Sequence, residues 1–95
     1  MVLVQDEWEF EWDPAKSAAN EHKHGMSFED AKAMWDDPYL REGPARGSAE
    51  GRRLAVARVG RGTYWTAVFV YRAGRIRIIS VRKSTRREVD FYEGN

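Results

Sequence analysis

Hydrophobic and polar residues alternate in several stretches of the chain, and each such stretch predicts a strand. Near the N-terminus, Trp8, Phe10 and Trp12 alternate with glutamates, as in a half-buried strand. The strand pattern returns after residue 39 and is clearest in three stretches, residues 53–59, 64–72 and 75–83. The middle one of these is apolar on both faces, which favours a central position in a sheet.

Two helices are predicted between these strand regions. The first begins at the N-cap Asp13 with Pro14 in the first turn, and it runs to about residue 24, where Gly25 ends it. The second begins at once, because Ser27 is a good N-cap with an acidic residue three positions later. It ends at residues 36–38, Asp-Asp-Pro.

The C-terminal part of the chain predicts a hairpin and a third helix. Ala73 and Gly74 form a tight connection, so the strands on either side are expected to pair antiparallel. Residues 86–93 form a short helix that Ser84 or Thr85 caps. Alternation divides the side chains of the last strand between two faces, with Ile76, Ile78 and Ser80 on one and Arg77, Ile79 and Val81 on the other.

These elements predict one small α+β domain over residues 1–95. Its antiparallel sheet carries the two N-terminal helices on one face, and the short C-terminal helix follows the last strand. Residues 1–7 are expected to form a loose tail, and residues 43–51, rich in Gly, Ala and Ser, a mobile loop.

Composition excludes several classes of protein. The 95 residues contain no cysteine, which rules out disulfides and thiolate chemistry and fits a cytoplasmic protein. The two histidines, His22 and His24, are too few for a convincing zinc site. No apolar run is long enough to span a bilayer, so we expect no membrane association, and no motif indicates a cofactor.

Charge is divided unevenly along the chain. Residues 1–50 contain 5 Lys and Arg against 12 Asp and Glu, and residues 51–95 contain 11 against 3, for net charges of −7 and +8. Most of the basic residues in the second half are arginine, which suits phosphate because its guanidinium is planar and always charged. A basic face for nucleic acid is one explanation, and ion pairing between the two halves is the other.

The basic residues support one kind of catalysis without further groups. RNA carries its own nucleophile, the 2′-hydroxyl, so a protein need only orient it, neutralise charge on the phosphate and manage proton transfer. Arg72 and Arg82 end the two strands of the hairpin, where fixed guanidiniums could serve this purpose. The antiparallel pairing places Arg72 near Arg75 and Arg82 near Tyr64, so the two are expected ~20–25 Å apart at ~3.3 Å per residue.

An ordered series of motifs resembles the BrnT family of type II toxin–antitoxin systems. The resemblance covers about residues 10–92 and includes Phe10-Glu11-Trp12-Asp13, Lys16, Asn20, Lys23-His24-Gly25, Ser27-Phe28, Arg53, Tyr71-Arg72, Arg77-Ile78-Ile79-Ser80-Val81-Arg82, Glu88 and Tyr92. The chain departs from the family pattern at Arg58, where glycine is common, and at Val81, where alanine is common.

The resemblance implies a RelE-like fold and an endoribonuclease toxin that inhibits translation. It also implies a cognate BrnA-like antitoxin with a ribbon-helix-helix DNA-binding domain, through which alone the toxin reaches operator DNA. The resemblance also implies that toxicity depends on Arg72 and Arg82. Catalysis by charge stabilisation from arginine would require no metal.

Further basic residues are candidates with structural alternatives. Lys23 and His24 could take part in catalysis or only stabilise the C-terminal end of the first helix. Arg53 could contact phosphate or pair with Glu50. Electrostatic contacts with RNA, or burial beneath the antitoxin, are expected for Lys83, Arg86 and Arg87. The competing hypothesis for the whole chain is a non-catalytic module that binds RNA or a partner.

Overall fold

A mixed β-sheet forms the centre of the structure, which is a computed structural model that describes residues 8–47 and 51–94. Across the sheet the strands lie in the order β1-β5-β4-β3-β2. Their bounds are β1 Phe10–Glu11, β2 Arg41–Pro44, β3 Arg53–Val59, β4 Thr63–Arg72 and β5 Arg75–Lys83. The predicted tail, residues 1–7, and residues 48–50 of the predicted loop lie outside the described residues.

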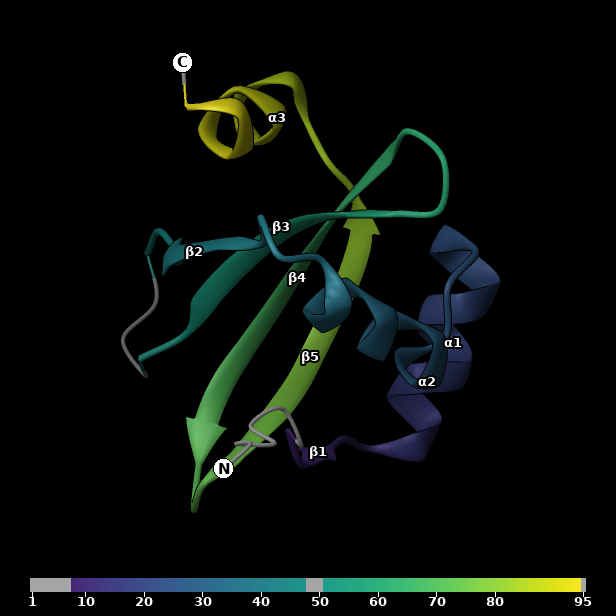
Figure 1. Cartoon of the computed structure of the whole chain (residues 1–95). Coiled ribbons are helices and arrows are strands. Elements are labelled where there is room, and N and C mark those ends of the chain that lie inside the picture. The colour runs from purple at the N-terminus through teal and green to yellow at the C-terminus, as the bar shows by residue number, and fades with distance from the viewer. Residues whose placement is uncertain (1–7, 48–50, 95) are drawn as a thin grey trace, which may run out of the picture.

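The helices occupy different sides of this sheet. The helix α1 spans Pro14–His24, α2 spans Phe28–Ala31, the 3-10 helix η1 follows over Lys32–Asp36, and α3 spans Arg86–Glu93. Figure 1 shows α1 and α2 together beside the sheet, and α3 apart from them at the end where β5 finishes. The α+β fold predicted from the sequence is therefore present.

The hydrophobic core lies between the sheet and the α2–η1 segment. Phe28 and Met34 are fully buried in the same cluster as Phe69 of β4, and Trp35 packs its ring edge-on between Phe10 and Phe69. The strands add mostly small and branched side chains to the core, including Ala55, Ala57, Ala67, Ile76, Ile78 and Val81. We call the sheet surface that these residues cover the core face.

Local sequence signals place the helix ends as expected. Asp13 accepts a hydrogen bond from the Ala15 amide, and Gly25 ends α1 with a φ of 85°. Ser27 caps α2, although the helix tightens into η1 after residue 31. Thr85 caps α3 in a capping box with Glu88, so Thr85, not Ser84, is the cap.

The sheet differs from the predicted antiparallel sheet at both of its edges. The strand β1 runs parallel to β5, with Phe10 opposite Ile76, and the chain then passes through α1, α2 and η1 to β2 at the opposite edge of the sheet. At the other edge, Gly43 and Pro44 belong to β2 and pair with β3, although the sequence suggested a loop from residue 43. The tight hairpin between β4 and β5 is present, and Ala73 and Gly74 have φ of 53° and 79°, as its turn requires.

A bulge in β5 corrects the predicted division of its side chains. Val68 pairs with Ser80 and Phe69 pairs with Ile78, so Ile79 is the extra residue. Beyond the bulge the alternation is shifted by one position. Val81 consequently joins Ile76 and Ile78 in the core, and Arg82 lies opposite Thr66 on the other face, not beside Tyr64 as predicted.

Asn20 closes the edge of β5 where no strand pairs with it. Its side-chain Nδ2 donates to the Val81 carbonyl at 2.9 Å, and its Oδ1 accepts from the Val81 amide at 3.1 Å. The same Nδ2 also donates to the Met26 carbonyl at 2.8 Å. The amide group thus imitates a neighbouring strand, so Asn20 has a structural role that ties α1 to β5.

Candidate functional site

The face of the sheet opposite the core carries most of the candidate functional residues. Since Phe69 and Ala67 face the core, alternation along β4 directs Thr66, Val68, Val70 and Arg72 to the opposite side. The residues of β5 opposite them share that side, namely Arg75, Arg77, Ser80 and Arg82. We call this surface the α3 face, because α3 lies over the end of it where β5 finishes (Figure 1). Arg72 and Arg82 thus lie on one face.

The two arginines are nevertheless far apart along that face. Arg82 lies opposite Thr66, and Arg72 is six residues further along β4. The separation is therefore ~20 Å at ~3.3 Å per residue, and a single phosphate cannot contact both guanidiniums. This agrees with the distance expected from the sequence.

A cleft of about 520 Å³ lies between α3 and the end of β2. Its floor is apolar and includes Leu54, Val68 and Phe91, while Arg46, Arg82 and Arg87 contribute basic groups to its lining. The remaining lining residues are Gly43, Pro44, Ala45, Thr85 and Glu88. An apolar floor beneath guanidiniums can receive a ligand that is both flat and anionic.

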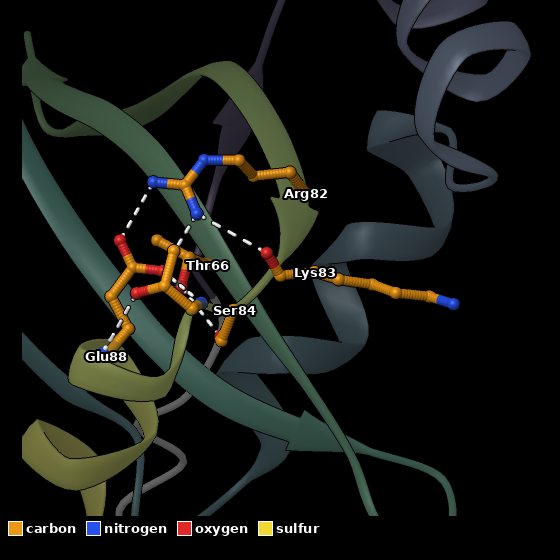
Figure 2. A network of polar contacts seen from close by, with 6 residues as sticks. Thr66, Arg82, Lys83, Ser84 and Glu88 are labelled. Atoms are coloured by element: carbon orange, nitrogen blue, oxygen red, sulfur yellow. Dashed lines mark hydrogen bonds and ion pairs between the residues drawn. The ribbon is translucent and has the colours of Figure 1, made fainter.

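Arg82 is held in this cleft by a polar network, shown in Figure 2. Its two terminal nitrogens donate to the two carboxylate oxygens of Glu88, each at 2.8 Å. Glu88 also accepts from the Thr66 hydroxyl at 2.9 Å and from the Thr85 amide at 2.9 Å. The Thr66 hydroxyl in turn lies 2.7 Å from that of Ser84. The guanidinium is therefore fixed in orientation from several sides.

The network changes the titration of both partners. Burial raises the pKa of Glu88, but hydrogen bonds from Arg82, Thr85 and Thr66 outweigh it, and the pKa falls to about 2. The hydrogen bond to Glu88 raises the pKa of Arg82 above its ordinary value. Glu88 is therefore ionised at neutral pH and is a poor proton acceptor there.

A second group of arginines occupies the hairpin end of the α3 face. Glu11 of β1 is within 3.9 Å of Arg72, 3.8 Å of Arg75 and 3.3 Å of Arg77. Arg75 also reaches Glu9, at 3.2 Å. A shallow hollow lies here, lined by Lys16, Arg52, Val70, Tyr71, Arg72, Arg77 and Ile79. Positive charge exceeds negative charge at this end.

The structure separates other predicted site residues from the α3 face. Arg53 lies opposite Phe69 on the core side and donates to Glu42 at 2.6 Å, a partner other than the Glu50 considered from the sequence. Glu42 also accepts a hydrogen bond from the Tyr71 hydroxyl at 2.8 Å. Burial is the larger cause, and this hydrogen bond the next, of a rise in the pKa of Tyr71 to about 12. Lys83 lies opposite the core residue Trp65, and its side chain points away from the Arg82 network, although its carbonyl accepts from Arg82 at 3.3 Å (Figure 2).

The remaining predicted residues lie on helices. Lys23 and His24 are in the last turn of α1 and do not line the cleft. Arg86 is highly exposed and pairs with Asp90 at 3.6 Å, whereas its neighbour Arg87 does line the cleft. Of the eight basic side chains proposed from the sequence, Arg82 and Arg87 share one site, and Arg72 lies further along the same face.

Sequence reasoning missed Arg46 and Phe91 as lining residues of the cleft. Arg46 belongs to a segment that the sequence marked only as a loop, and Phe91 lies on a helix recognised mainly by its cap. The ring of Phe91 lies over Gly43, where an added Cβ would be 3.3 Å from it. The sequence placed Gly43 at the start of a loop, so its close approach to another side chain was visible only once the structure assigned it to β2.

The described residues, 8–47 and 51–94, offer no candidate metal site and no candidate membrane span. No group of three or more His, Asp or Glu side chains in this part is placed to hold a metal ion. None of its helices has the length and apolar character needed to cross a membrane.

The fold and the charge arrangement define a class, that of small α+β proteins with an arginine-lined sheet face. Residues 12–88 match the family model described as "Ribonuclease toxin, BrnT, of type II toxin-antitoxin system". The chain therefore belongs to the BrnT family, whose members are ribonuclease toxins of type II toxin–antitoxin systems, and the family predicted from the sequence is confirmed.

A solved structure supports the fold independently. The crystal structure of the Brucella abortus ribonuclease toxin BrnT matches with a TM-score of 0.66 and 20% sequence identity. The match covers 83% of this chain and 99% of that one. No curated protein sequence matches the chain significantly.

Proposed function

We propose that this chain is a metal-independent endoribonuclease in which Arg82 stabilises charge on the phosphate that is cleaved. One observation carries the proposal: the guanidinium of Arg82 is fixed by Glu88 at a cleft that Arg46 and Arg87 also line. Its side chain remains 38% exposed, so a phosphate can approach it without breaking the pair. A charge fixed before the substrate arrives needs no reorganisation during the reaction.

The proposed reaction is attack of an RNA 2′-hydroxyl on the adjacent phosphorus. The new bond joins the 2′-oxygen to phosphorus, and the bond from phosphorus to the 5′-oxygen breaks. The 2′-proton passes to water and the leaving oxygen takes a proton from water, giving a 2′,3′-cyclic phosphate and a 5′-hydroxyl. Glu88 is not assigned the role of base, because its pKa is about 2 and both of its oxygens are occupied.

The other basic residues are proposed to bind RNA rather than to share this phosphate. Arg72 is about a strand length from Arg82 and contacts a different phosphate of the same strand. Arg87 contacts RNA in the cleft. Five residues, Lys23, His24, Arg53, Lys83 and Arg86, lie outside the cleft and contact flanking RNA or an antitoxin.

The antitoxin is proposed to be BrnA-like, with a ribbon-helix-helix DNA-binding domain. It would neutralise the toxin in the cytoplasm by covering the α3 face with an acidic segment, because that face carries an excess of arginine. Operator DNA would be reached only through this antitoxin. Toxin released from it would cut RNA and thereby inhibit translation.

The test is cleavage of a 5′-labelled RNA by the purified chain in the presence of a chelator, compared with Arg82→Ala and with Arg61→Ala. Arg61 lies in the turn between β3 and β4, outside the cleft, so this variant removes the same charge elsewhere. We expect cyclic phosphate ends from the wild type and from Arg61→Ala, and at least ~100-fold slower cleavage by Arg82→Ala. Growth arrest on induced expression should follow the same order.

Intact RNA with well-folded wild-type chain would overturn the ribonuclease proposal. The second candidate would then take its place, a module that binds RNA without cutting it. The observation that favours this candidate is the carboxylate in the cleft, since Glu88 is committed to Arg82 and unsuited to proton transfer. A gel shift of uncut RNA would support it.

A further inference from the structure

We propose that the cleft between α3 and β2 is a subsite for one unpaired nucleotide of single-stranded RNA. The base lies on the floor formed by Leu54, Val68 and Phe91, and its flanking phosphates contact Arg46 and Arg87. This inference rests on the proposed function, because it names the part of the substrate that this site holds.

The first support is that the two arginines are available to a ligand. Nearby arginines are engaged within the chain: Arg82 with Glu88, Arg41 with the Phe91 carbonyl at 2.6 Å, and Arg86 with Asp90. Among the described residues, the side chains of Arg46 and Arg87 have no hydrogen bond, ion pair or ring contact. Two unsatisfied guanidiniums at one cleft form a site for anionic groups.

The second support is the apolar floor beneath them. Attraction of a polyanion requires only charge, yet this cleft combines its arginines with two aliphatic side chains and an aromatic ring. The ring of Phe91 is fixed from both sides, by Gly43 beneath it and by the Arg41 guanidinium 4.5 Å from its centroid. A fixed ring beside Leu54 provides a surface on which a base can stack or pack.

The third support is size and accessibility. A volume of about 520 Å³ is in the range of sites for single small ligands, and is too small for a duplex. In a double helix the bases are stacked and paired, so their faces cannot reach a floor of this kind. The cleft therefore selects an unpaired base and places an adjoining phosphate near the fixed charge of Arg82, which would determine where the strand is cut.

Binding can be measured without cleavage by using 2′-O-methyl RNA, which lacks the nucleophile. Fluorescence anisotropy would compare a single-stranded oligomer, the same oligomer with abasic positions, and a hairpin duplex of equal length. The variants are Arg46→Gln and Arg87→Gln, with Arg61→Gln as the matched control for loss of charge. Thermal melting of each variant shows that it is folded.

We expect the abasic oligomer to bind about tenfold more weakly than the intact one, because the phosphates remain but the stacking contact is lost. The duplex should also bind more weakly. Arg46→Gln and Arg87→Gln should each weaken binding severalfold and reduce the salt dependence by about one phosphate contact, while Arg61→Gln should have less than a ~2-fold effect.

Equal binding of the intact and abasic oligomers would overturn the subsite, as would equal effects of all three substitutions. If the chain binds an acidic peptide tightly and binds none of the RNA oligomers, the cleft is a protein-docking site instead. These outcomes are separable from failure of the ribonuclease proposal. If the wild type cuts RNA but the cleft variants bind normally, only the subsite is wrong; if base-dependent binding occurs without cutting, only the ribonuclease proposal is wrong.

Discussion

The two ends of the α3 face both carry arginine, but the arginines are held in different ways. At the cleft end, Arg82 is bound to Glu88 through two parallel hydrogen bonds of 2.8 Å, and the Glu88 side chain is only 15% exposed. At the hairpin end, Arg72 is 64% exposed and its nearest approach to Glu11 is 3.9 Å. One guanidinium is fixed, and the other is largely free in solvent.

The difference assigns separate tasks to the two ends. A guanidinium held by a bidentate pair has a defined direction, and the pair as a whole carries little net charge to attract a polyanion from a distance. At the hairpin end, Arg72, Arg75 and Arg77 share the carboxylates of Glu9 and Glu11, so a positive charge remains. Under the proposed function, the cleft end would position the scissile phosphate, and the hairpin end would attract the polyanion.

Removing each arginine in turn should produce the largest contrast between the two ends. We expect Arg82→Ala to lower the free energy of unfolding by about 2 kcal/mol, because Glu88 would keep its partly buried charge without its main partner. Arg72→Ala should change it by less than ~0.5 kcal/mol, since exposed pairs contribute little. Urea unfolding followed by tryptophan fluorescence measures both values.

A double-mutant cycle provides the control for this comparison. Combining Arg82→Ala with Glu88→Ala should restore part of the loss, because no unpaired carboxylate is then left behind. Equal destabilisation by Arg72→Ala and Arg82→Ala would contradict the assignment of a structural pair to the cleft end.

The pH dependence of stability should identify the same pair. The pKa of Glu88 is lowered from 4.5 in the unfolded chain to about 2 in the folded one. Its contribution is therefore fully present above about pH 4.5, and it is lost as the pH falls toward about 2. We expect the stability difference between the wild type and Glu88→Gln to shrink over this interval.

The measurement is the free energy of unfolding at several pH values for both proteins. Asp37, whose pKa is also lowered, is present in both and cancels in the difference. A difference that stays constant down to about pH 2 would show that the Glu88 carboxylate is not stabilised by its partners.

The smallest predicted effect concerns charge at the hairpin end. Glu11→Gln removes the carboxylate shared by three arginines, so we expect 2′-O-methyl RNA to bind a few-fold more tightly at low salt, with a steeper salt dependence. Glu29→Gln is the matched control, because Glu29 lies on α2 and pairs with Lys32. If both variants bind RNA equally, net charge alone decides affinity and the hairpin end has no special role.

Much of the local structure was determined by short sequence signals. Asp13, Pro14 and Gly25 define the ends of α1, Ala73-Gly74 defines the hairpin, and Thr85 defines the start of α3. Each signal acts through neighbouring residues, whose backbone groups it caps or whose φ it permits. The family motifs were also legible in the sequence, whereas the roles assigned to Arg72 and Arg82 stay predictions.

Tertiary contacts decided what those residues can do. The bulge at Ile79 turns Arg82 from the core to the α3 face, and Asn20 supports the edge of β5 at Val81 from a position 61 residues away. The cleft brings Arg46 and Phe91 together from opposite halves of the chain. Alternation and capping report only on nearby residues, whereas sheet register and ion pairing depend on which distant segments meet. The sequence therefore determined the elements and the family, and the packing of those elements determined the site.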